Sequence, residues 1–225
     1  MQRVELAQKV LSENARLASD LRERFQQHGV LCLNLISSPG SGKTSLLERT
    51  LARLPQTSRI AVLTGDIQTE NDAIRLRRYG FPVKQITTGG TCHLDARMID
   101  HHLAAWDLAD LDILFIENVG NLVCPSSYDL GEDLRCVLLS VTEGEDKSLK
   151  YPTIFNSADV AIITKSDLAE AVEFDSETAL RNIQSVRPGM KVFQLSAKTG
   201  QGVEDFLQFL AQRLAESRAT TVIEK

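Results

Sequence analysis

The feature that most constrains the fold is a segment rich in Ser and Gly, Ser37–Thr44, which directly follows the apolar run Leu31–Ile36. The apolar run predicts a buried strand, and the residues from Lys43 onward predict a helix. A turn between a strand and a helix N-terminus points successive backbone N–H groups at an anion. The segment departs from the pattern G-x-x-x-x-G-K-[ST] only at its first position, where Ser37 replaces Gly. The pattern therefore predicts a phosphate-binding loop, whereas a plain surface turn leaves Lys43-Thr44 without a role.

The side chains at the end of this loop have predicted roles in binding a nucleoside triphosphate. Lys43 is expected to reach the β- and γ-phosphates, and the Thr44 hydroxyl is expected to hold Mg²⁺. The residues predicted to contact the nucleotide here are Gly40, Ser41, Gly42, Lys43, Thr44 and Ser45.

Length and charge limit the remaining possibilities. At 225 residues the chain suits a single domain, residues 1–225, with a sizeable core. The net charge of −5 gives no general attraction for nucleic acid or for an anionic membrane. No apolar run approaches the roughly 20 residues that a membrane span needs, and the first residues do not form a secretory signal. We therefore expect a cytoplasmic protein that binds neither nucleic acid nor membrane.

Apolar runs alternate with helical segments along the chain. This alternation predicts an α/β fold with a mostly parallel sheet and helices on both faces, as in phosphate-loop NTPases. An amphipathic N-terminal helix is expected at about residues 3–28, before Gly29. Ligands of such sheets lie beyond the carboxyl ends of the strands, where every motif described below falls. The expected strands are Leu31–Ile36, Ile60–Thr64, Val83–Thr87, Ile113–Glu117, Arg135–Thr142, Val160–Thr164 and Val192–Leu195; the expected helices are Lys43–Leu54, Thr69–Tyr79, Cys92–Ala105, Ser176–Val186 and Val203–Glu216.

Two segments near the C-terminus follow strands and resemble the guanine-recognition elements of GTPases, N/T-K-x-D and S-A-K. By that resemblance Asp167 accepts hydrogen bonds from guanine N1–H and the 2-amino group, Lys165 lies along the base, and the Ala197 N–H donates to O6. Adenine would leave the carboxylate facing a lone pair, which costs roughly 1–3 kcal/mol or more. Thr164 replaces the commoner Asn and leaves one supporting hydrogen bond open; taken alone, T-K-x-D also fits a polar loop with a capping Asp. The predicted base contacts are Thr164, Lys165, Asp167, Ser196, Ala197 and Lys198.

An acidic residue and a glycine follow the apolar run Ile113–Ile116. We expect Glu117 to bind Mg²⁺ or its water shell, and the Gly120 N–H to contact the γ-phosphate. Asp66 is the second expected carboxylate on the Mg²⁺ side, with turn capping as its alternative and Glu70 as a weaker candidate. The predicted catalytic set is Lys43, Asp66, Glu117 and Gly120, and the predicted magnesium ligands are Thr44, Asp66 and Glu117.

No arginine finger or catalytic glutamine is evident from the sequence. The basic cluster Arg75, Arg77 and Arg78 predicts a solvated helix face, with contact of one of them to phosphate or a partner as the alternative. We therefore expect slow intrinsic GTP hydrolysis, on the order of 10⁻⁴–10⁻² s⁻¹, by analogy with unassisted GTPases.

Cys92, His93 and Cys124 are the candidate ligands of a second metal ion, in loops at the predicted nucleotide edge of the sheet. Thr91 is expected to cap a helix that begins at Cys92, so that the helix dipole lowers the pKa of the thiol. Two thiolates and an imidazole suit Zn²⁺ or Ni²⁺ and leave a position for water or for a group from another subunit. By spacing alone, a small buried thiol beside a capping His is the alternative.

The combination of these motifs resembles the hydrogenase nickel-incorporation GTPases (HypB type) of the SIMIBI class. The matching segments are Ser37–Thr44, Thr88–Asp95, Glu117–Pro125, Glu143–Lys147 and Thr164–Asp167. The resemblance implies a cytoplasmic GTPase that forms a homodimer with GTP and delivers nickel during maturation of [NiFe] hydrogenase. It implies as partners the hydrogenase maturation proteins and the hydrogenase large subunit. It also implies that the three metal ligands lie at the dimer interface and that Lys147 reaches the nucleotide of the partner subunit.

The resemblance also sets what is not expected. Family members often carry an N-terminal Cys-rich motif or a His-rich tract, but residues 1–29 contain no Cys and only His28. Neither a tight N-terminal metal site nor nickel storage is therefore expected of this chain.

Gly120 and Cys124 lie four positions apart, so a change at the γ-phosphate is expected to alter the metal site. Nickel affinity should then differ between the GDP and GTP states. Three other functions stay open: a urease-maturation GTPase, a phosphate-loop kinase acting on a small molecule, and a metal-responsive dimer that barely hydrolyses its nucleotide. The urease relative typically has a Cys-x-His motif, and a kinase leaves the guanine-recognition segments without a purpose.

Overall fold

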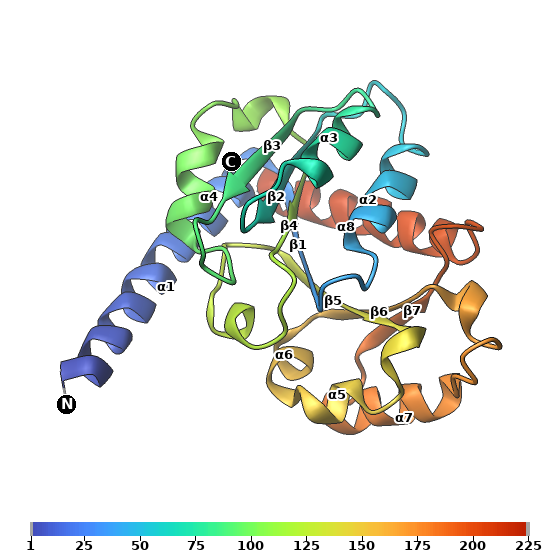
Figure 1. The fold of residues 1–225 in the computed structure, drawn as a ribbon. Helices are drawn as coiled ribbons and strands as arrows, with labels where there is room; N and C mark the ends of the chain where they lie inside the picture. Colours follow the sequence, from blue (N-terminus) through green and yellow to red (C-terminus); the bar gives the residue numbers. More distant parts are fainter. Residues whose placement is uncertain (1, 224–225) are drawn as a thin grey trace.

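The computed structural model describes residues 2–223 of the chain, with side chains described for residues 8–219. Its centre is a sheet of seven parallel strands in the order β3-β2-β4-β1-β5-β6-β7 (Figure 1). The predicted parallel sheet is confirmed, and each strand lies within two residues of its expected bounds. The strands are β1 Leu31–Ser37, β2 Ile60–Asp66, β3 Val83–Thr87, β4 Ile113–Glu117, β5 Leu134–Ser140, β6 Val160–Thr164 and β7 Lys191–Gln194.

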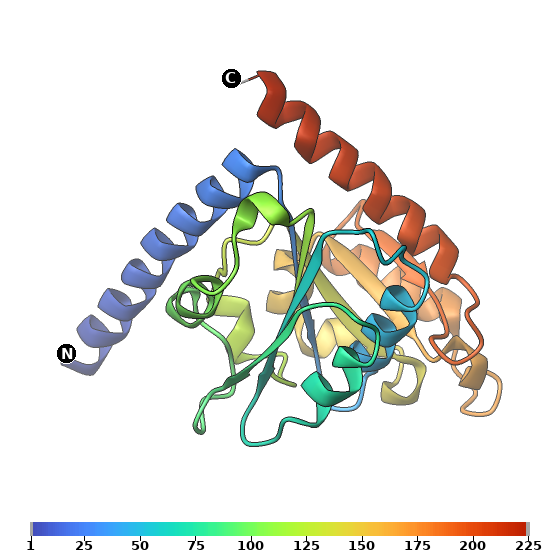
Figure 2. The same cartoon turned by 90° about the horizontal axis from the view of Figure 1, so that it is seen from above.

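Helices connect the strands and cover both faces of the sheet (Figures 1 and 2). The α-helices are α1 Gln2–His28, α2 Lys43–Leu51, α3 Asn71–Arg77, α4 Ala96–Leu103, α5 Lys147–Lys150, α6 Pro152–Ser157, α7 Ser176–Val186 and α8 Val203–Ile223. Short 3₁₀ helices occur at η1 Leu108–Asp110, η2 Cys124–Ser127, η3 Val141–Glu143 and η4 Ser166–Leu168. None of the helices within residues 2–223 combines the length and the apolarity that crossing a membrane requires.

The central strand β1 positions the phosphate loop between its two neighbours. All seven of its residues are buried, and it pairs with β4 on one side and β5 on the other. Leu35 lies opposite Glu117, and Ser37 lies opposite Leu138. The loops that follow β1, β4 and β5 therefore leave the same edge of the sheet, where parallel sheets bind their ligands.

Three apolar clusters hold the layers together. Leu46, Leu47 and Phe206 belong to the cluster that packs α2, α3 and α8 on one face of the sheet. A second cluster packs α1 and α4 on the other face, and a third packs α6 and α7 against β5 and β6. Complete burial of one such Leu or Phe stabilises the fold by roughly 1.5–3 kcal/mol.

The helix α1 ends where its sequence changes to Gly29, which has a φ of +65°. The Val30 N–H donates to the Phe25 carbonyl at 2.9 Å, which satisfies one of the last carbonyls of the helix. On its inner face α1 buries Ala18, Leu21 and Phe25. Its N-terminal half diverges from the rest of the molecule in Figures 1 and 2.

The segment after β5 differs from its expectation. Arg135–Thr142 was expected to be a strand, but β5 ends at Ser140, because Ser140 and Glu143 form a capping box around η3. The charged segment that follows contains α5 and leads into α6. These helices are only four and six residues long, too short for a hydrophobic period to be visible in the sequence.

Candidate nucleotide and metal site

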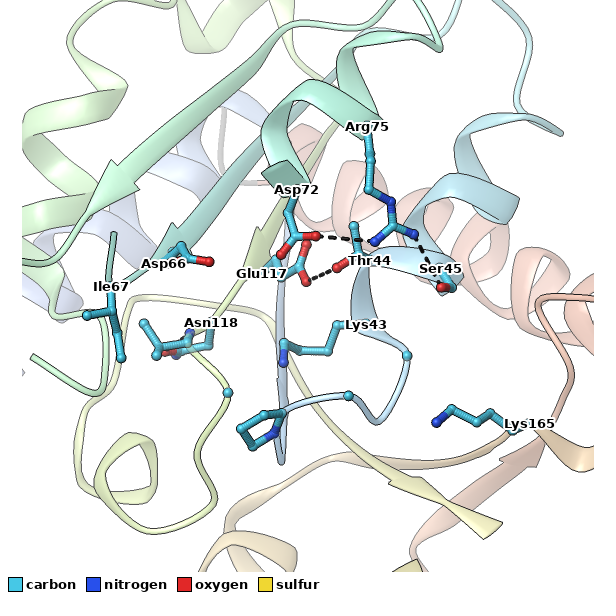
Figure 3. Close-up of a pocket in the computed structure, with 16 residues that line it drawn as sticks. Lys43, Thr44, Ser45, Asp66, Ile67, Asp72, Arg75, Glu117, Asn118 and Lys165 are labelled. Atoms are coloured by element: carbon cyan, nitrogen blue, oxygen red, sulfur yellow. Dashed lines mark hydrogen bonds and ion pairs between the residues drawn. The ribbon is translucent and has the colours of Figure 1, made fainter. Parts of the chain in front are cut away.

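A cavity of about 440 Å³ opens at the carboxyl edge of the sheet, around the phosphate loop (Figure 3). Gly42 precedes α2 with a φ of +100°, a conformation that an L side chain rarely adopts. The N-terminus of α2 thereby faces the cavity, where its free N–H groups favour an anion. The cavity is lined by Pro39, Gly40, Gly42, Lys43, Thr44, Ser45, Gly65, Asp66, Ile67, Asp72, Arg75, Glu117, Asn118, Val119, Gly120 and Lys165.

Lys43 is held in place by the residue that departs from the common pattern. Its Nζ donates to Ser37 Oγ at 3.0 Å, and Ser37 Oγ in turn donates to the Ser38 carbonyl at 2.7 Å. Lys43 is 7% exposed, and burial lowers the pKa of its ammonium group while the Glu117 carboxylate acts in the opposite direction. Ser37 thus supplies an oxygen that positions the lysine when no phosphate does.

Glu117 and Thr44 form the polar floor of the cavity. Thr44 Oγ1 donates to Glu117 Oε1 at 2.7 Å, whereas the buried Glu117 Oε2 has no hydrogen-bond partner. Burial raises the pKa of Glu117 to about 7. A hydroxyl beside a carboxylate with a free oxygen matches the hard oxygen ligands that Mg²⁺ prefers next to a bound phosphate.

Asp66 lines the same cavity, but its carboxylate is engaged in its own turn. It accepts hydrogen bonds from the N–H of Gln68 at 2.9 Å, the N–H of Thr69 at 3.1 Å and the Thr69 hydroxyl at 3.0 Å. Burial acts to raise the pKa of Asp66, and these hydrogen bonds lower it below its ordinary value. Glu70 is absent from the cavity lining and lies 3.8 Å from Arg77.

Asp72 and Arg75 are pocket residues that no sequence motif marks. Both lie on α3 and line the cavity, with Asp72 close to Thr44 and Glu117 in Figure 3. Arg75 is tied to Glu48 at 2.6 Å and to Asp72 at 3.3 Å. For Arg75 the structure favours the alternative to a solvated face, because α3 turns this side chain toward the phosphate loop, although 38% of it stays exposed. The one hint in the sequence was that Asp72 and Arg75, an acidic and a basic residue, lie three positions apart on the helix after β2.

Gly120 lies directly on the phosphate loop. A Cβ atom at Gly120 would stand 2.9 Å from Pro39 Cα and 3.0 Å from Pro39 N, closer than real Cβ contacts. Only glycine therefore lets the segment after β4 reach this position. The structure brings Gly120 together with Lys43, Thr44 and Glu117 around one cavity.

A second cavity of about 230 Å³ shares Gly42, Ser45 and Lys165 with the first. Ser196 Oγ donates to Asp167 Oδ1 at 2.6 Å and so orients that carboxylate. Thr164 Oγ1 donates to the Ser41 carbonyl at 2.6 Å, which supplies the supporting hydrogen bond that the replacement of Asn had left open. The cavity is lined by Gly42, Ser45, Leu46, Thr164, Lys165, Asp167, Leu168, Leu195, Ala197 and Lys198.

Lys147 is bound within its own subunit. Its Nζ lies 2.9 Å from Glu143 Oε1, and the other oxygen of Glu143 accepts from Ser41 Oγ at 2.7 Å. The Lys147 side chain is 17% exposed and its Nζ lies 5.1 Å from the ring centroid of Tyr151. Lys147 is therefore connected through Glu143 to the phosphate loop.

Cys92, His93 and Cys124 come together beside the nucleotide cavity. Their candidate ligand atoms all lie within 4.8 Å of one another, and the two Sγ atoms are 2.9 Å apart. All three residues are half-buried. The His93 ring stacks on Tyr128, with centroids 3.9 Å apart and an interplanar angle of 27°. Two soft sulfur atoms and an imidazole suit nickel or zinc.

The expected helical position of Cys92 and His93 is wrong. The helix α4 begins at Ala96, and its N-cap is Asp95, which accepts from the Met98 N–H at 2.8 Å. Thr91 instead donates back to the Thr88 carbonyl at 3.2 Å. Cys92 therefore lies outside α4, and hydrogen bonding to Cys124 raises the pKa of Cys92.

Comparisons with known proteins show the family to which the chain is similar. Residues 31–194 match the family described as CobW/HypB/UreG, nucleotide-binding domain. The hydrogenase maturation factor HypB of Escherichia coli (strain K12) is 49% identical over 207 residues, covering 92% of this chain and 71% of that protein. The hydrogenase/urease maturation factor HypB of Helicobacter pylori (strain ATCC 700392 / 26695) is 44% identical over 225 residues, covering 97% and 91%. The crystal structure of HypB from Helicobacter pylori in complex with nickel has a TM-score of 0.85 and 45% identity, covering 91% of this chain and 96% of that one.

Proposed function

Because the chain belongs to the CobW/HypB/UreG family of nucleotide-binding proteins, we propose that it is a GTP-hydrolysing metallochaperone that delivers nickel for maturation of [NiFe] hydrogenase. The observation that carries this function is the cluster Cys92, His93 and Cys124, on segments that adjoin the phosphate cavity. Nickel is the cargo, and Zn²⁺ is the other metal that these ligands suit.

Asp167 reads the base as guanine. Its carboxylate, oriented by Ser196, faces the cavity formed with Ala197 and Lys198. It would accept from guanine N1–H and the 2-amino group, while adenine would leave it unpaired. Lys165 lines both cavities and would lie along the base.

The phosphate cavity holds the triphosphate and its cation. Thr44 and Glu117 would hold Mg²⁺, which supplies charge neutralisation at the phosphates when it is bound. Asp66 and Asp72 are the further carboxylates on this side of the cavity. Lys43, positioned by Ser37, would donate to the β- and γ-phosphate oxygens. The Gly120 N–H is the proposed contact to the γ-phosphate.

Intrinsic hydrolysis is slow, on the order of 10⁻⁴–10⁻² s⁻¹. The arginine nearest the phosphates, Arg75, is bound to Glu48 and Asp72 and is not free to stabilise the transition state. With such slow hydrolysis, the protein is a timing switch whose nucleotide state controls its binding of the nickel ion.

Two asparagine side chains, Asn118 and Asn121, join the segment after β4 to the segment that carries Cys92. Asn118 Oδ1 accepts from the N–H of Leu94 at 3.2 Å and from the N–H of Val119 at 3.0 Å. Asn121 Nδ2 donates to the Cys92 carbonyl at 3.2 Å. A shift of the segment that contains Gly120 would therefore move both cysteine loops. Such coupling is typically about 1–3 kcal/mol, or 5–150-fold in metal affinity.

The chain acts as one GTPase domain, residues 1–225, in the cytoplasm, and forms a homodimer in the presence of GTP. Val123 supports an interface at the metal site, because it is 61% exposed beside Cys124. The two half-buried cysteines leave room for ligands from a second subunit. Lys147 would leave Glu143 to reach the nucleotide of that subunit. The maturation proteins and the hydrogenase large subunit are the proposed partners.

The test is a Ni²⁺ titration combined with light scattering, in GDP and in a non-hydrolysable GTP analogue. Wild type should bind nickel with different affinity in the two states and dimerise with the analogue, and Cys92→Ala should lose nickel binding. Cys136→Ala is the matched control, since that thiol is buried in β5 away from the cluster. Equal nickel affinity in both states and a monomer throughout would contradict the proposal.

Urease maturation is a second candidate, favoured by the name of the Helicobacter pylori relative. Activation of nickel-free hydrogenase or of nickel-free urease in lysates that lack the chain separates the two. A small-molecule kinase would leave the Asp167 cavity without a role. A measured preference for ATP over GTP would be needed to support that function.

A further inference from the structure

We infer that Asn14 of α1 is a positioning residue that sets the distance between the two cysteine-bearing segments. Its Oδ1 accepts from the N–H of Ala96 at 2.8 Å, and its Nδ2 donates to the carbonyl of Asp129 at 2.9 Å. Ala96 follows His93 by three residues, and Asp129 follows Cys124 by five. One side chain from the N-terminal helix thus bridges both halves of the cluster. The inference rests on the nickel site proposed above.

The chemistry of the two contacts selects an asparagine. Ala96 is the first residue of α4, so its N–H has no partner inside the helix. Asp129 presents a carbonyl, which can only accept. A planar amide offers one acceptor and a donor on a single group, whereas a carboxylate lacks the donor and an aliphatic side chain lacks both. Asn14 is 6% exposed, so water does not readily replace either contact.

The bridge is connected to the metal ligands through residues that are themselves fixed. Leu94 is fully buried and packs against Gly65, where a Cβ would stand 2.8 Å from Leu94 Cδ2. On the other arm, Tyr128 precedes Asp129 and stacks on His93. The Tyr128 N–H also donates to the carbonyl of Pro125, the residue after Cys124, at 3.3 Å. A displacement at Asn14 therefore has a short path to each cysteine.

Further contacts of α1 secure the same two segments. Arg22 donates to both carboxylate oxygens of Asp129 at 2.7 and 2.8 Å. Arg24 pairs with Asp100 of α4 at 2.5 Å. Asn14 is the first buried side chain after the exposed residues 8–13. The N-terminal helix is thus a brace for the two segments that carry the metal ligands.

The test measures, in the absence of metal, how readily the Cys92 and Cys124 thiols meet. The protein is equilibrated with reduced and oxidised glutathione, and the fraction with a Cys92–Cys124 disulfide is read by mass spectrometry. Each disulfide consumes two protein thiols and converts one glutathione disulfide into two glutathiones, so the equilibrium reports the effective concentration of one thiol at the other. Ni²⁺ titration, followed by the thiolate-to-nickel absorption, is run in parallel.

Asn14→Ala should lower the effective concentration of the thiols at least tenfold and weaken Ni²⁺ binding by a similar factor, with GDP affinity within twofold of wild type. Asn14→Asp keeps the acceptor for Ala96 but loses the donor for Asp129, and should show the same direction of change. It serves as the second variant if the alanine variant does not fold. Glu13→Ala is the control, because it removes the exposed ion pair with Arg97 on the same turn and leaves both bridges intact.

Wild-type disulfide equilibrium and nickel affinity in a folded Asn14 variant would overturn the inference. A shifted disulfide equilibrium in a protein that binds no nickel would instead contradict the proposed function while supporting the brace. The two failures are therefore distinguishable.

Discussion

The phosphate cavity and the cysteine cluster lie side by side, yet they are built in opposite ways. Lys43, Thr44 and Glu117 are buried and bonded to one another or to the loop before any ligand arrives. The cysteines are half-buried, lie outside the α-helices and the strands, and are held by contacts from residues far away in sequence. The nucleotide side is thus set by its own motif, while the metal side depends on its neighbours and can be adjusted by them.

The largest expected effect is on the nucleotide side alone. Lys43→Ala removes the buried cation that faces the phosphates and should weaken GTP binding about 1000-fold, ~4 kcal/mol. Nickel affinity without nucleotide should stay within about twofold, because Lys43 makes no contact with the cysteine loops. Isothermal titration with each ligand measures both values, and Lys150→Ala is the exposed control. Loss of nickel binding in the nucleotide-free variant would contradict the proposal that the metal site does not depend on Lys43.

The next largest effect concerns the free energy of unfolding, which burial of the Glu117 carboxylate makes dependent on pH. The folded pKa of Glu117 is about 7, above the ordinary 4.5, so the folded state holds its proton more tightly than the unfolded state. This contribution to stability is complete below pH 4.5 and is lost as the pH rises to 7. Glu117→Gln should therefore stabilise the nucleotide-free protein by roughly 3 kcal/mol at pH 8 and little at pH 4.5.

Chemical denaturation across this pH range measures the difference for Glu117→Gln. Glu70→Gln, at an exposed position, is the control and should show no such trend. A constant difference between Glu117→Gln and wild type from pH 4.5 to 8 would show that the carboxylate is not buried in solution.

A smaller effect is expected from the aromatic support of the metal site. Tyr128→Leu removes the ring that stacks on His93 and should weaken Ni²⁺ binding about fivefold, ~1 kcal/mol, with GTP affinity unchanged. Tyr128→Phe keeps the ring and should restore wild-type affinity in the same titration. If the phenylalanine variant is as weak as the leucine variant, stacking is not what positions the imidazole.

The smallest effect is expected at Ser37. Ser37→Ala removes the oxygen that positions Lys43 and should weaken GTP binding about threefold, ~0.7 kcal/mol. Fluorescent-nucleotide titration measures this change, and Ser38→Ala is the neighbouring control. A tighter complex in Ser37→Ala would mean that Ser37 competes with the phosphates for Lys43.

Much of the fold was predictable, because the central strands are apolar runs of ordinary length that end in polar motifs. The phosphate loop and the guanine-recognition segments were visible for the same reason: their chemistry lies within a few consecutive residues. The capping of α4 was mispredicted, because Thr91 and Asp95 are both good caps and only tertiary contacts choose between them. Asn14 and Asp72 could not be found from the sequence, since their partners are set by helix packing.

The three residues between Gly120 and Cys124 act as a tether of fixed length. A chain of four steps spans at most roughly 14 Å, so Cys124 cannot lie farther than this from Gly120 in the cavity lining. Cys92 follows a different strand, β3, and is not tied to Gly120 by such a short stretch of chain. Under the proposed function, metal release would therefore separate the two sulfurs by only a short distance, and an insertion between Gly120 and Cys124 would lengthen that distance.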